Sequence, residues 1–223
     1  SSILNTIISS LSVNISARIA EDIQKDEFIL LEEDTWFADE IKSRLGADYS
    51  PTHFLWVGFD LPEQLKEHAE DFDEITATVA VFKNSDVNTV SADNCPLDGS
   101  AVGLHLNVFL SGDTLTGDLS EEIQNSVRHE LEHVVQEEFP HFLDYLDYHK
   151  INFALSHEPG RFCLYLTQPA EVSAHVRGYQ EISRDILEFS KKTGRLLEDY
   201  VEQGLITREE KSAVFWCWKD WYD

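Results

Sequence analysis

Two histidines with a glutamate between them are the residues of this chain best placed to do chemistry. They stand in the segment RHELEHVV as His129, Glu130 and His133. In an α-helix, side chains four positions apart lie on the same face, so both imidazoles can bind one metal ion. Zinc accepts imidazole nitrogen readily, and Glu130 lies about 100° around the helix from His129, beside a water that the ion would activate. The segment therefore predicts a catalytic Zn²⁺ site with Glu130 as general base.

A catalytic zinc site needs a third protein ligand, and several residues compete for that role. Glu171 is the best candidate, because it stands in the first turn of a predicted helix that begins at Pro169 and would hold the carboxylate rigidly. The alternative interpretation of Glu171 is an ordinary first-turn acid stabilised by the helix dipole. Small residues at Ala174 and Gly178 would let this helix approach the histidine helix closely. The competing ligands are histidines, namely His141, His149, His157 and His175.

The helix that carries the two histidines is predicted from its cap and its apolar stripe. Asp118 or Ser120 can cap it, and Glu121 and Glu122 in the first turn suit the helix dipole. The helix is expected to end near Glu138, before a Phe-Pro pair. Its apolar residues recur at helical spacing and form the side expected to face the core: Ile123, Val127, Leu131, Val134 and Val135.

The region before this helix has the composition of a small sheet. Three segments rich in β-branched and aromatic residues are predicted strands: Thr52 to Phe59, Ile75 to Phe82 and Val102 to Leu110. An acidic helix is expected from Pro62 to Phe72, and a polar loop from Lys83 to Ser100. The sheet is expected to be mixed or antiparallel.

Helices are predicted before and after the sheet region in the sequence. An apolar stripe predicts a helix at the start of the chain, with these members: Ile3, Leu4, Ile7, Ile8, Leu11, Ile15 and Ile19. The other expected helices run from Asp34 to Leu45, from Pro169 to a point before Gly194, and from Arg208 to Tyr222, with the stretch 141–167 part helix and part loop. Thr207 and Glu210 form a capping box for the last of them. The sequence predicts one α+β domain over 1–223, made of a helical segment 1–50, a sheet 51–112 and a helical part 118–223.

The charge of the chain is strongly negative, with 42 Asp and Glu against 17 Lys and Arg, a formal net charge of −25. A solvated acidic surface is the simplest interpretation; an acidic groove for a basic peptide or partner and imitation of a nucleic-acid backbone are the others. Direct nucleic-acid binding is disfavoured, since no basic stripe exists to neutralise phosphates. No apolar run of about 20 residues predicts a membrane span. Cys95, Cys163 and Cys217 are scattered, without a CxxC pair, which favours a reducing, cytoplasmic location.

A resemblance can be named on these motifs. HELEH, followed by a helix carrying ExxAH, resembles the gluzincin zinc metallopeptidases, and YLTQPAEVSAHVRGY is similar to short metallopeptidases encoded by tailed bacteriophages. The resemblance covers Arg128 to Tyr179. It implies a zincin-like fold, Glu171 as the third ligand, hydrolysis of peptide bonds, and the strand from Val102 to Leu110 as an edge strand that binds substrate. A phage-encoded protein would act in the host cytoplasm or in the virion. The metzincin pattern is excluded by Gln136 and Phe139.

Several other residues have more than one interpretation. His175 stands where gluzincins often have Asp, and it is expected either to hydrogen-bond a ligand carboxylate, to stabilise an oxyanion as a catalytic residue, or to pack between helices. Tyr165 and Tyr179 are expected either to stabilise an oxyanion or to serve in packing. His105 is expected either to line the cleft or to be an ordinary histidine of a strand. The aromatic C-terminus is either core or a docking surface: Phe215, Trp216, Trp218, Trp221 and Tyr222.

The expected partner is a peptide or protein substrate, and the sequence predicts no oligomeric state. The rival hypothesis is a non-catalytic virion or interaction protein that keeps zinc for structure. A fourth coordination position filled by a side chain would favour that rival, whereas an open position would favour an enzyme.

Overall fold

Four strands pair into one mixed sheet in the computed structural model of this chain, which describes residues 2–28, 53–69, 73–96, 101–139, 143 and 153–222. The strands are β1 (His53–Asp60), β2 (Glu74–Phe82), β3 (Thr89–Pro96) and β4 (Ala101–Phe109). Their order across the sheet is β1-β2-β4-β3, with β2 parallel to β4 and the other pairs antiparallel. The predicted α+β class is confirmed, and the sheet precedes the histidine helix as expected.

Strand β3 overturns two predictions. The polar loop expected from Lys83 to Ser100 contains this strand, which pairs with β4 on one side. Since β3 lies outside β4, the strand predicted from Val102 to Leu110 is an interior strand and the predicted edge role is wrong. Pairing of a short, half-polar strand depends on its neighbour, which local composition does not reveal.

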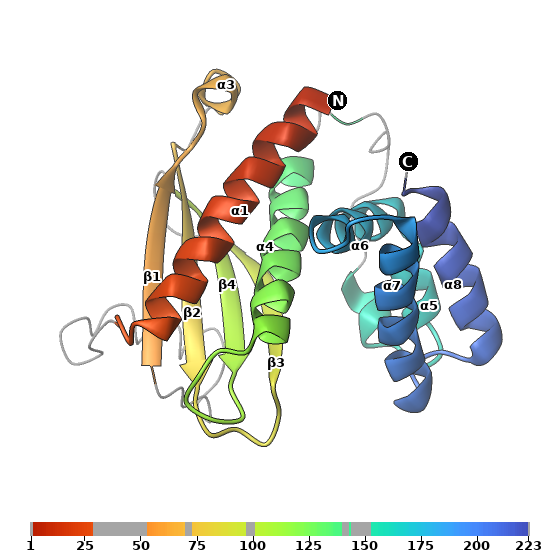
Figure 1. Ribbon diagram of the computed structural model, residues 1–223. Helices are drawn as coiled ribbons and strands as arrows, with labels where there is room; N and C mark the ends of the chain where they lie inside the picture. The colour runs from red at the N-terminus through yellow and green to blue at the C-terminus, as the bar shows by residue number, and fades with distance from the viewer. Residues whose placement is uncertain are drawn as a thin grey trace.

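Helices α1 (Ser2–Gln24) and α4 (Gly117–Glu138) cover one face of this sheet (Figure 1). The first apolar core lies between them and the strands, and the stripe predicted at the start of the chain contributes Leu4, Ile8, Leu11, Ile15 and Ile19 to it. By length and composition α1 could cross a membrane, as could a signal sequence or the core helix of a soluble protein. Here it packs against β1 and α4. The cytoplasmic location stays a prediction.

The acidic segment after β1 forms much less helix than expected. Helix α3 covers only Glu63–Lys66, with Leu65 as its one buried residue, so little apolar area is available to stabilise a longer helix. Residues 70–72 of the predicted helix, and the whole helix expected from Asp34 to Leu45, lie outside the described residues.

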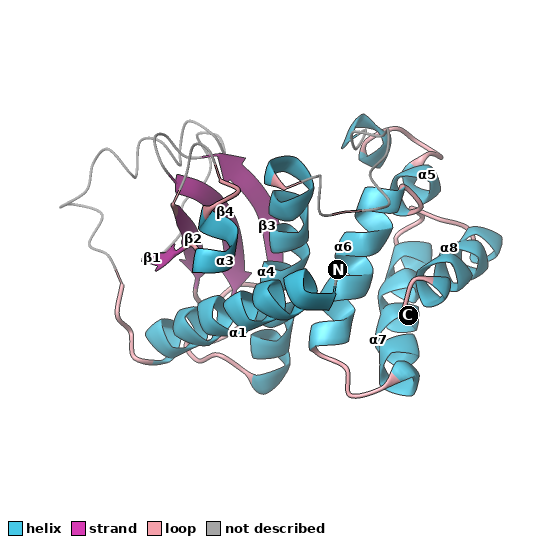
Figure 2. Ribbon diagram, turned by 90° about the horizontal axis from the view of Figure 1, so that it is seen from above, coloured by secondary structure: helices cyan, strands magenta, loops and turns pink. Residues whose placement is uncertain are grey.

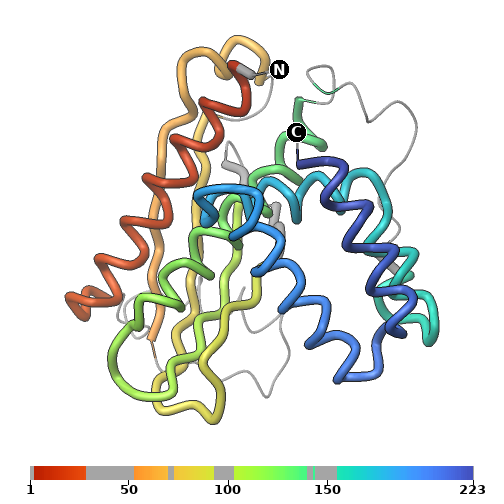
Figure 3. The backbone as a smooth tube through the Cα atoms, turned by 45° about the vertical axis from the view of Figure 1, so that its right-hand side comes forward, coloured from red at the N-terminus to blue at the C-terminus, as the bar shows by residue number. Residues whose placement is uncertain are grey.

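The C-terminal helices pack around a second apolar core, beside the sheet layer (Figure 2). They follow a 3-10 turn, Phe153–Ser156, and are α5 (Phe162–Leu166), α6 (Pro169–Glu181), α7 (Ile186–Glu202) and α8 (Arg208–Asp220). The helix expected from Pro169 towards Gly194 is thus two helices. Asp185 caps the second through the N–H of Glu188, and this new start turns the chain back. The two chain termini lie at the same end of the molecule (Figure 3).

The last helix agrees with the sequence. The capping box of Thr207 and Glu210 is present, and Trp218 is fully buried with its indole N–H donating to the carbonyl of Leu166 at 3.0 Å. Trp216 is 56% exposed, so the aromatic segment is part core and part surface. Cys163 and Cys217 are free thiols.

Helices α4 and α6 meet closely where the two cores adjoin. A side-chain carbon at Gly178 would lie 2.9 Å from the backbone oxygen of Asn125 on α4, nearer than carbon and oxygen normally approach. The small residue predicted to allow close approach therefore does so.

We expect Gly178→Ala and Gly194→Ala to change stability in opposite directions. The first forces α6 away from α4 and should lower the free energy of unfolding by about 1–3 kcal/mol. The second places a methyl group in open space within α7, where alanine should raise it by about 0.5–1 kcal/mol. Urea unfolding followed by circular dichroism measures both, and equal effects would contradict the close packing.

Candidate metal centre

Helix α4 turns its apolar face to the first core and its histidines to the second. Thr116 begins the helix, since its hydroxyl accepts from the N–H of Leu119 at 3.2 Å, and not Asp118 or Ser120 as predicted. The predicted apolar stripe is buried in the first core. The helix starts earlier than expected, so Glu121 and Glu122 lie beyond its first turn.

Three side chains from α4 and α6 converge at the contact of the two helices. The ligand atoms of His129, His133 and Glu171 all lie within 4.8 Å of one another. The Nε2 atoms of the two histidines are 3.2 Å apart. The Glu171 carboxylate lies across both rings, with Oε1 3.3 Å from Nε2 of His129 and Oε2 3.2 Å from Nε2 of His133.

These separations fit the donor set to one small cation. Donors about 2.0 Å from a tetrahedral zinc ion lie about 3.3 Å from one another. The Oε2 atom of Glu171 is buried and makes no hydrogen bond within the described part of the chain, so it lacks the donor that a buried carboxylate oxygen needs. Two imidazole nitrogens and a carboxylate therefore fit Zn²⁺, the ion that the sequence predicts, and would hold it from three sides.

The carboxylate of Glu171 draws positive charge to this point. Burial alone would raise its pKa, but His129 and His133 hold the pKa of Glu171 well below its ordinary value. Burial likewise opposes the charged form of His133, yet the adjacent Glu171 carboxylate raises the pKa of His133 to about 9. The centre is thus arranged to stabilise a cation between its three groups.

Gln136 fixes the orientation of His133. Its Oε1 lies 2.8 Å from Nδ1 of His133, and its Nε2 donates to the carbonyl oxygen of Ala170 at 2.9 Å. Because an amide oxygen only accepts, Nδ1 carries a proton, so in the neutral ring that a metal requires Nε2 would present its lone pair to the centre. The same side chain ties α4 to the first turn of α6, next to Glu171.

A buried charge network reinforces the contact of α4 and α6. Arg128 pairs with Glu132 at 2.8 Å and lies 3.6 Å from Glu181 on α6. The other oxygen of Glu132 accepts from the hydroxyl of Ser173 at 2.9 Å. Arg128 is 1% exposed, so breaking any of these pairs would leave a buried charge without a partner.

His175 supports the centre from the side of α6. Its Nδ1 donates to the backbone oxygen of Glu171 at 2.9 Å and lies 3.3 Å from Oε1 of the same residue. Its ring stacks on Trp218 at 4.4 Å and meets His129 edge-on at 4.5 Å. Burial lowers the pKa of His175 to about 4, with the charge of His129 acting in the same direction. Nδ1 is thus directed at Glu171, the ligand-supporting arrangement; the catalytic role of His175 stays a prediction.

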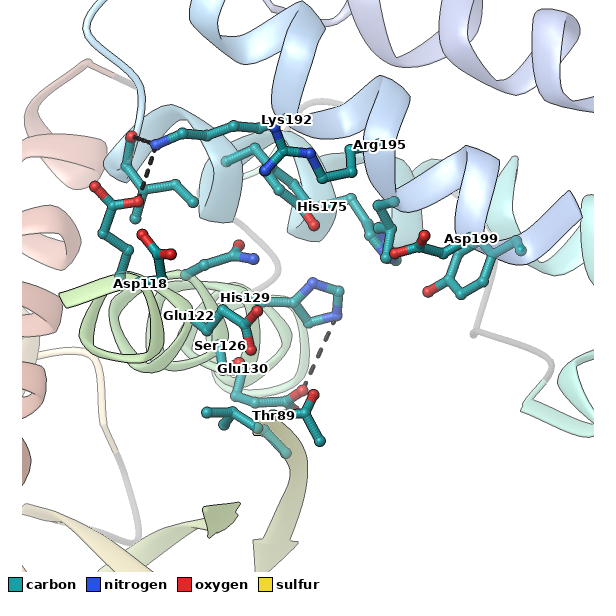
Figure 4. A pocket seen from close by; sticks show the side chains of 18 of the residues that line it. Thr89, Asp118, Glu122, Ser126, His129, Glu130, His175, Lys192, Arg195 and Asp199 are labelled. Atoms are coloured by element: carbon teal, nitrogen blue, oxygen red, sulfur yellow. Dashed lines mark hydrogen bonds and ion pairs between the residues drawn. The ribbon is translucent and has the colours of Figure 1, made fainter. Parts of the chain in front are cut away.

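Glu130 lies next to His129, where the candidate centre borders a cleft. Its Oε1 is 4.0 Å from Nε2 of His129, and both residues line a cleft of about 580 Å³ (Figure 4). One wall of the cleft is β3, through Thr89, Val90 and Ala92, and the opposite wall is α7. A carboxylate beside the candidate metal donors and facing a cavity is the placement that a general base would need.

Of the remaining residues singled out in the sequence, some lie near this cleft and others lie away from it. Tyr165 lies beside Glu171, whose charge adds to burial in raising the pKa of the phenol, and Tyr179 lines the cleft next to Asn125. His157 is exposed elsewhere, and His105 is buried in β4, 3.1 Å from Asn107. His141 and His149 lie outside the described residues.

Because comparisons with known proteins gave no match, any assignment of function rests on the geometry of the site. The chain matches none of the protein-family models, curated proteins or solved structures with which it was compared.

We expect Gln136→Ala to weaken zinc binding by about 10–100-fold, because His133 loses the partner that fixes its tautomer. Competition against a chromophoric chelator measures the dissociation constant. Glu137→Ala, at an exposed position next to it, is the matched control and should bind zinc as the wild type does. An unchanged constant in Gln136→Ala would rule out the orienting role.

Metal removal should loosen the contact between the two cores. At a free zinc concentration 100 times the dissociation constant, binding adds about 2.7 kcal/mol to the free energy of unfolding, which is about 5–10 °C in Tm for a chain of this size. Calorimetry with and without chelator measures the shift, and amide exchange should rise in the first turn of α6 more than in β2. His157→Ala should show the same zinc-dependent shift, and a wild-type Tm indifferent to zinc would argue against the centre.

Proposed function

We propose that this protein is a zinc-dependent hydrolase, and specifically a metallopeptidase of gluzincin type. The observation that carries the proposal is the convergence of His129, His133 and Glu171 beside Glu130 at the edge of a cleft. His129, His133 and Glu171 would hold the ion, which when bound supplies Lewis-acid polarisation of a water and of the substrate carbonyl.

Glu130 performs the proton transfers in this proposal. Its carboxylate takes a proton from the attacking water and delivers it to the amine that leaves when the C–N bond breaks. Gln136 and Tyr165 keep the ligands in position, and burial of the centre excludes bulk water from the groups that bear charge.

A peptide substrate is supported by the sheet edge that borders the cleft. Strand β3 pairs with β4 on one side, no described strand pairs with its other side, and its residues line the cleft with Glu130. An extended peptide can add to such an edge through backbone hydrogen bonds, which hold its scissile bond in line. In the proposal β3 takes over the substrate-binding role that the resemblance implies for the strand from Val102 to Leu110.

The alternative is a non-catalytic zinc protein that acts through its acidic surface and aromatic C-terminus. The exposed face of Trp216, with Lys219 4.9 Å from its ring centre, favours such a docking role. The orientation of His175 favours the enzyme, because its Nδ1 binds Glu171 and leaves the three-ligand set without a fourth side chain among the described residues.

Two substitutions separate metal binding from turnover. Glu130→Gln should keep stoichiometric zinc and lose about 10²–10⁴-fold in kcat, because the amide cannot accept the proton. His133→Ala should lose the metal. Zinc content by atomic emission and hydrolysis of a denatured protein substrate provide the two readouts. Full activity in Glu130→Gln would refute the mechanism, and stoichiometric zinc in His133→Ala would refute the ligand assignment.

A further inference from the structure

The cleft carries a row of acidic side chains on the same helix as the metal ligands. Asp118, Glu122 and His129 share one face of α4, since they are separated by four and seven positions, and all three line the cleft (Figure 4). Lys192 and Arg195 line the α7 wall across from them. The row therefore leads from the open end of the cleft to the centre.

Two of the acids in this cleft are available to a ligand. Glu121, on the neighbouring face, is paired with Lys192 at 3.1 Å. Asp118 and Glu122 have no cationic partner in the residues that the structure describes. Desolvation raises the pKa of Glu122, and the negative charge of Asp118 raises it further. The backbone hydrogen bond from Val90 lowers the pKa but only partly offsets this rise. These two like charges repel one another, and a cationic group between them would relieve the repulsion.

Glu122 also occupies the open edge of β3. The backbone N–H of Val90 donates to its carboxylate, so this N–H points away from β4 and into the cleft. In an antiparallel pair, both backbone groups of such a residue face outward, where an added strand would bind them. A peptide that pairs with β3 must therefore displace Glu122 from Val90, and it would place its own side chains beside the freed carboxylate.

Helix and strand dimensions relate this row to the scissile bond. Glu122 lies about 10 Å from His129 along the helix axis, which an extended peptide spans in about three residues. Asp118 lies about 6 Å further along, close to the distance of about 6.7 Å between alternate residues of a strand. Alternate residues of a strand point the same way, so one extended peptide can present a side chain to each acid.

From this juxtaposition we propose that Glu122 and Asp118 are specificity-determining residues that select extended peptides with cationic side chains at two alternate positions. The nearer cationic residue lies about three residues from the bond that is cleaved. The inference rests on the proposed peptidase function, and it adds the substrate class to it.

Peptide binding tests the inference without turnover. The probe is a fluorescent extended peptide with lysines at two alternate positions, compared with the same peptide carrying glutamines, on the full zinc-loaded Glu130→Gln chain. We expect the lysine peptide to bind about tenfold more tightly at low salt, with the difference shrinking as salt rises. Adding Glu122→Gln should reduce the difference to about threefold, and adding Glu137→Gln, an exposed control on the same helix, should leave it intact. Equal affinities for the two peptides would overturn the inference.

The cleavage pattern gives the second readout. Wild-type enzyme acting on a mixed peptide pool should produce cuts with Lys or Arg enriched several-fold at the third and fifth residues from the bond, on one side of it. In Glu122→Gln the enrichment at the third residue should disappear. Efficient cleavage without positional enrichment would overturn the inference and leave the peptidase assignment intact. Cleavage of no peptide at all would overturn the peptidase assignment, while the affinities still decide whether the acidic row selects cationic peptides.

Discussion

The contact between α4 and α6 is the interaction on which the site depends. The histidines stand on a helix anchored in the first core, and Glu171 stands on a helix anchored in the second. The contact between the helices is largely polar: an arginine with its carboxylates, a glutamine bridge, and the donors of the centre. A shift of α6 by one residue would separate several of these pairs at once, so they specify one register.

Buried polar contacts of this kind add little net stability, because desolvation of each charge offsets most of the attraction. Their effect here is positional. The two apolar cores supply the stability of each half, and the polar contact decides how the halves meet. The carboxylate of Glu171 reaches from one half to the histidines of the other, so in the proposed zinc protein metal binding would be linked to the arrangement of the two halves.

The sequence predicts those parts of this site that follow from the periodicity of a single helix. The spacing of His129 and His133, the apolar face beneath them and the first-turn position of Glu171 all follow from one helix at a time. Gln136 and the buried Arg128–Glu132 pair were missed, although a charged pair at helical spacing within an apolar stripe is a signal that can be recognised. Strand β3 and the edge it forms were not predicted, since its composition is that of a polar loop and its extended form depends on pairing with β4, the next strand along the chain.

The two cores also differ in how far apart in the sequence their contacting elements lie. Helices α5 to α8 are consecutive in sequence, whereas the first core joins α1 to α4 across the whole sheet. Contacts between neighbouring segments form faster than distant ones, because less loop entropy is lost. The helical half is therefore expected to fold ahead of the sheet half, with Glu171 in place before the histidines. In the proposed zinc protein, acquisition of the metal would then be the last step of folding, and a loaded centre would mark a chain that has finished it.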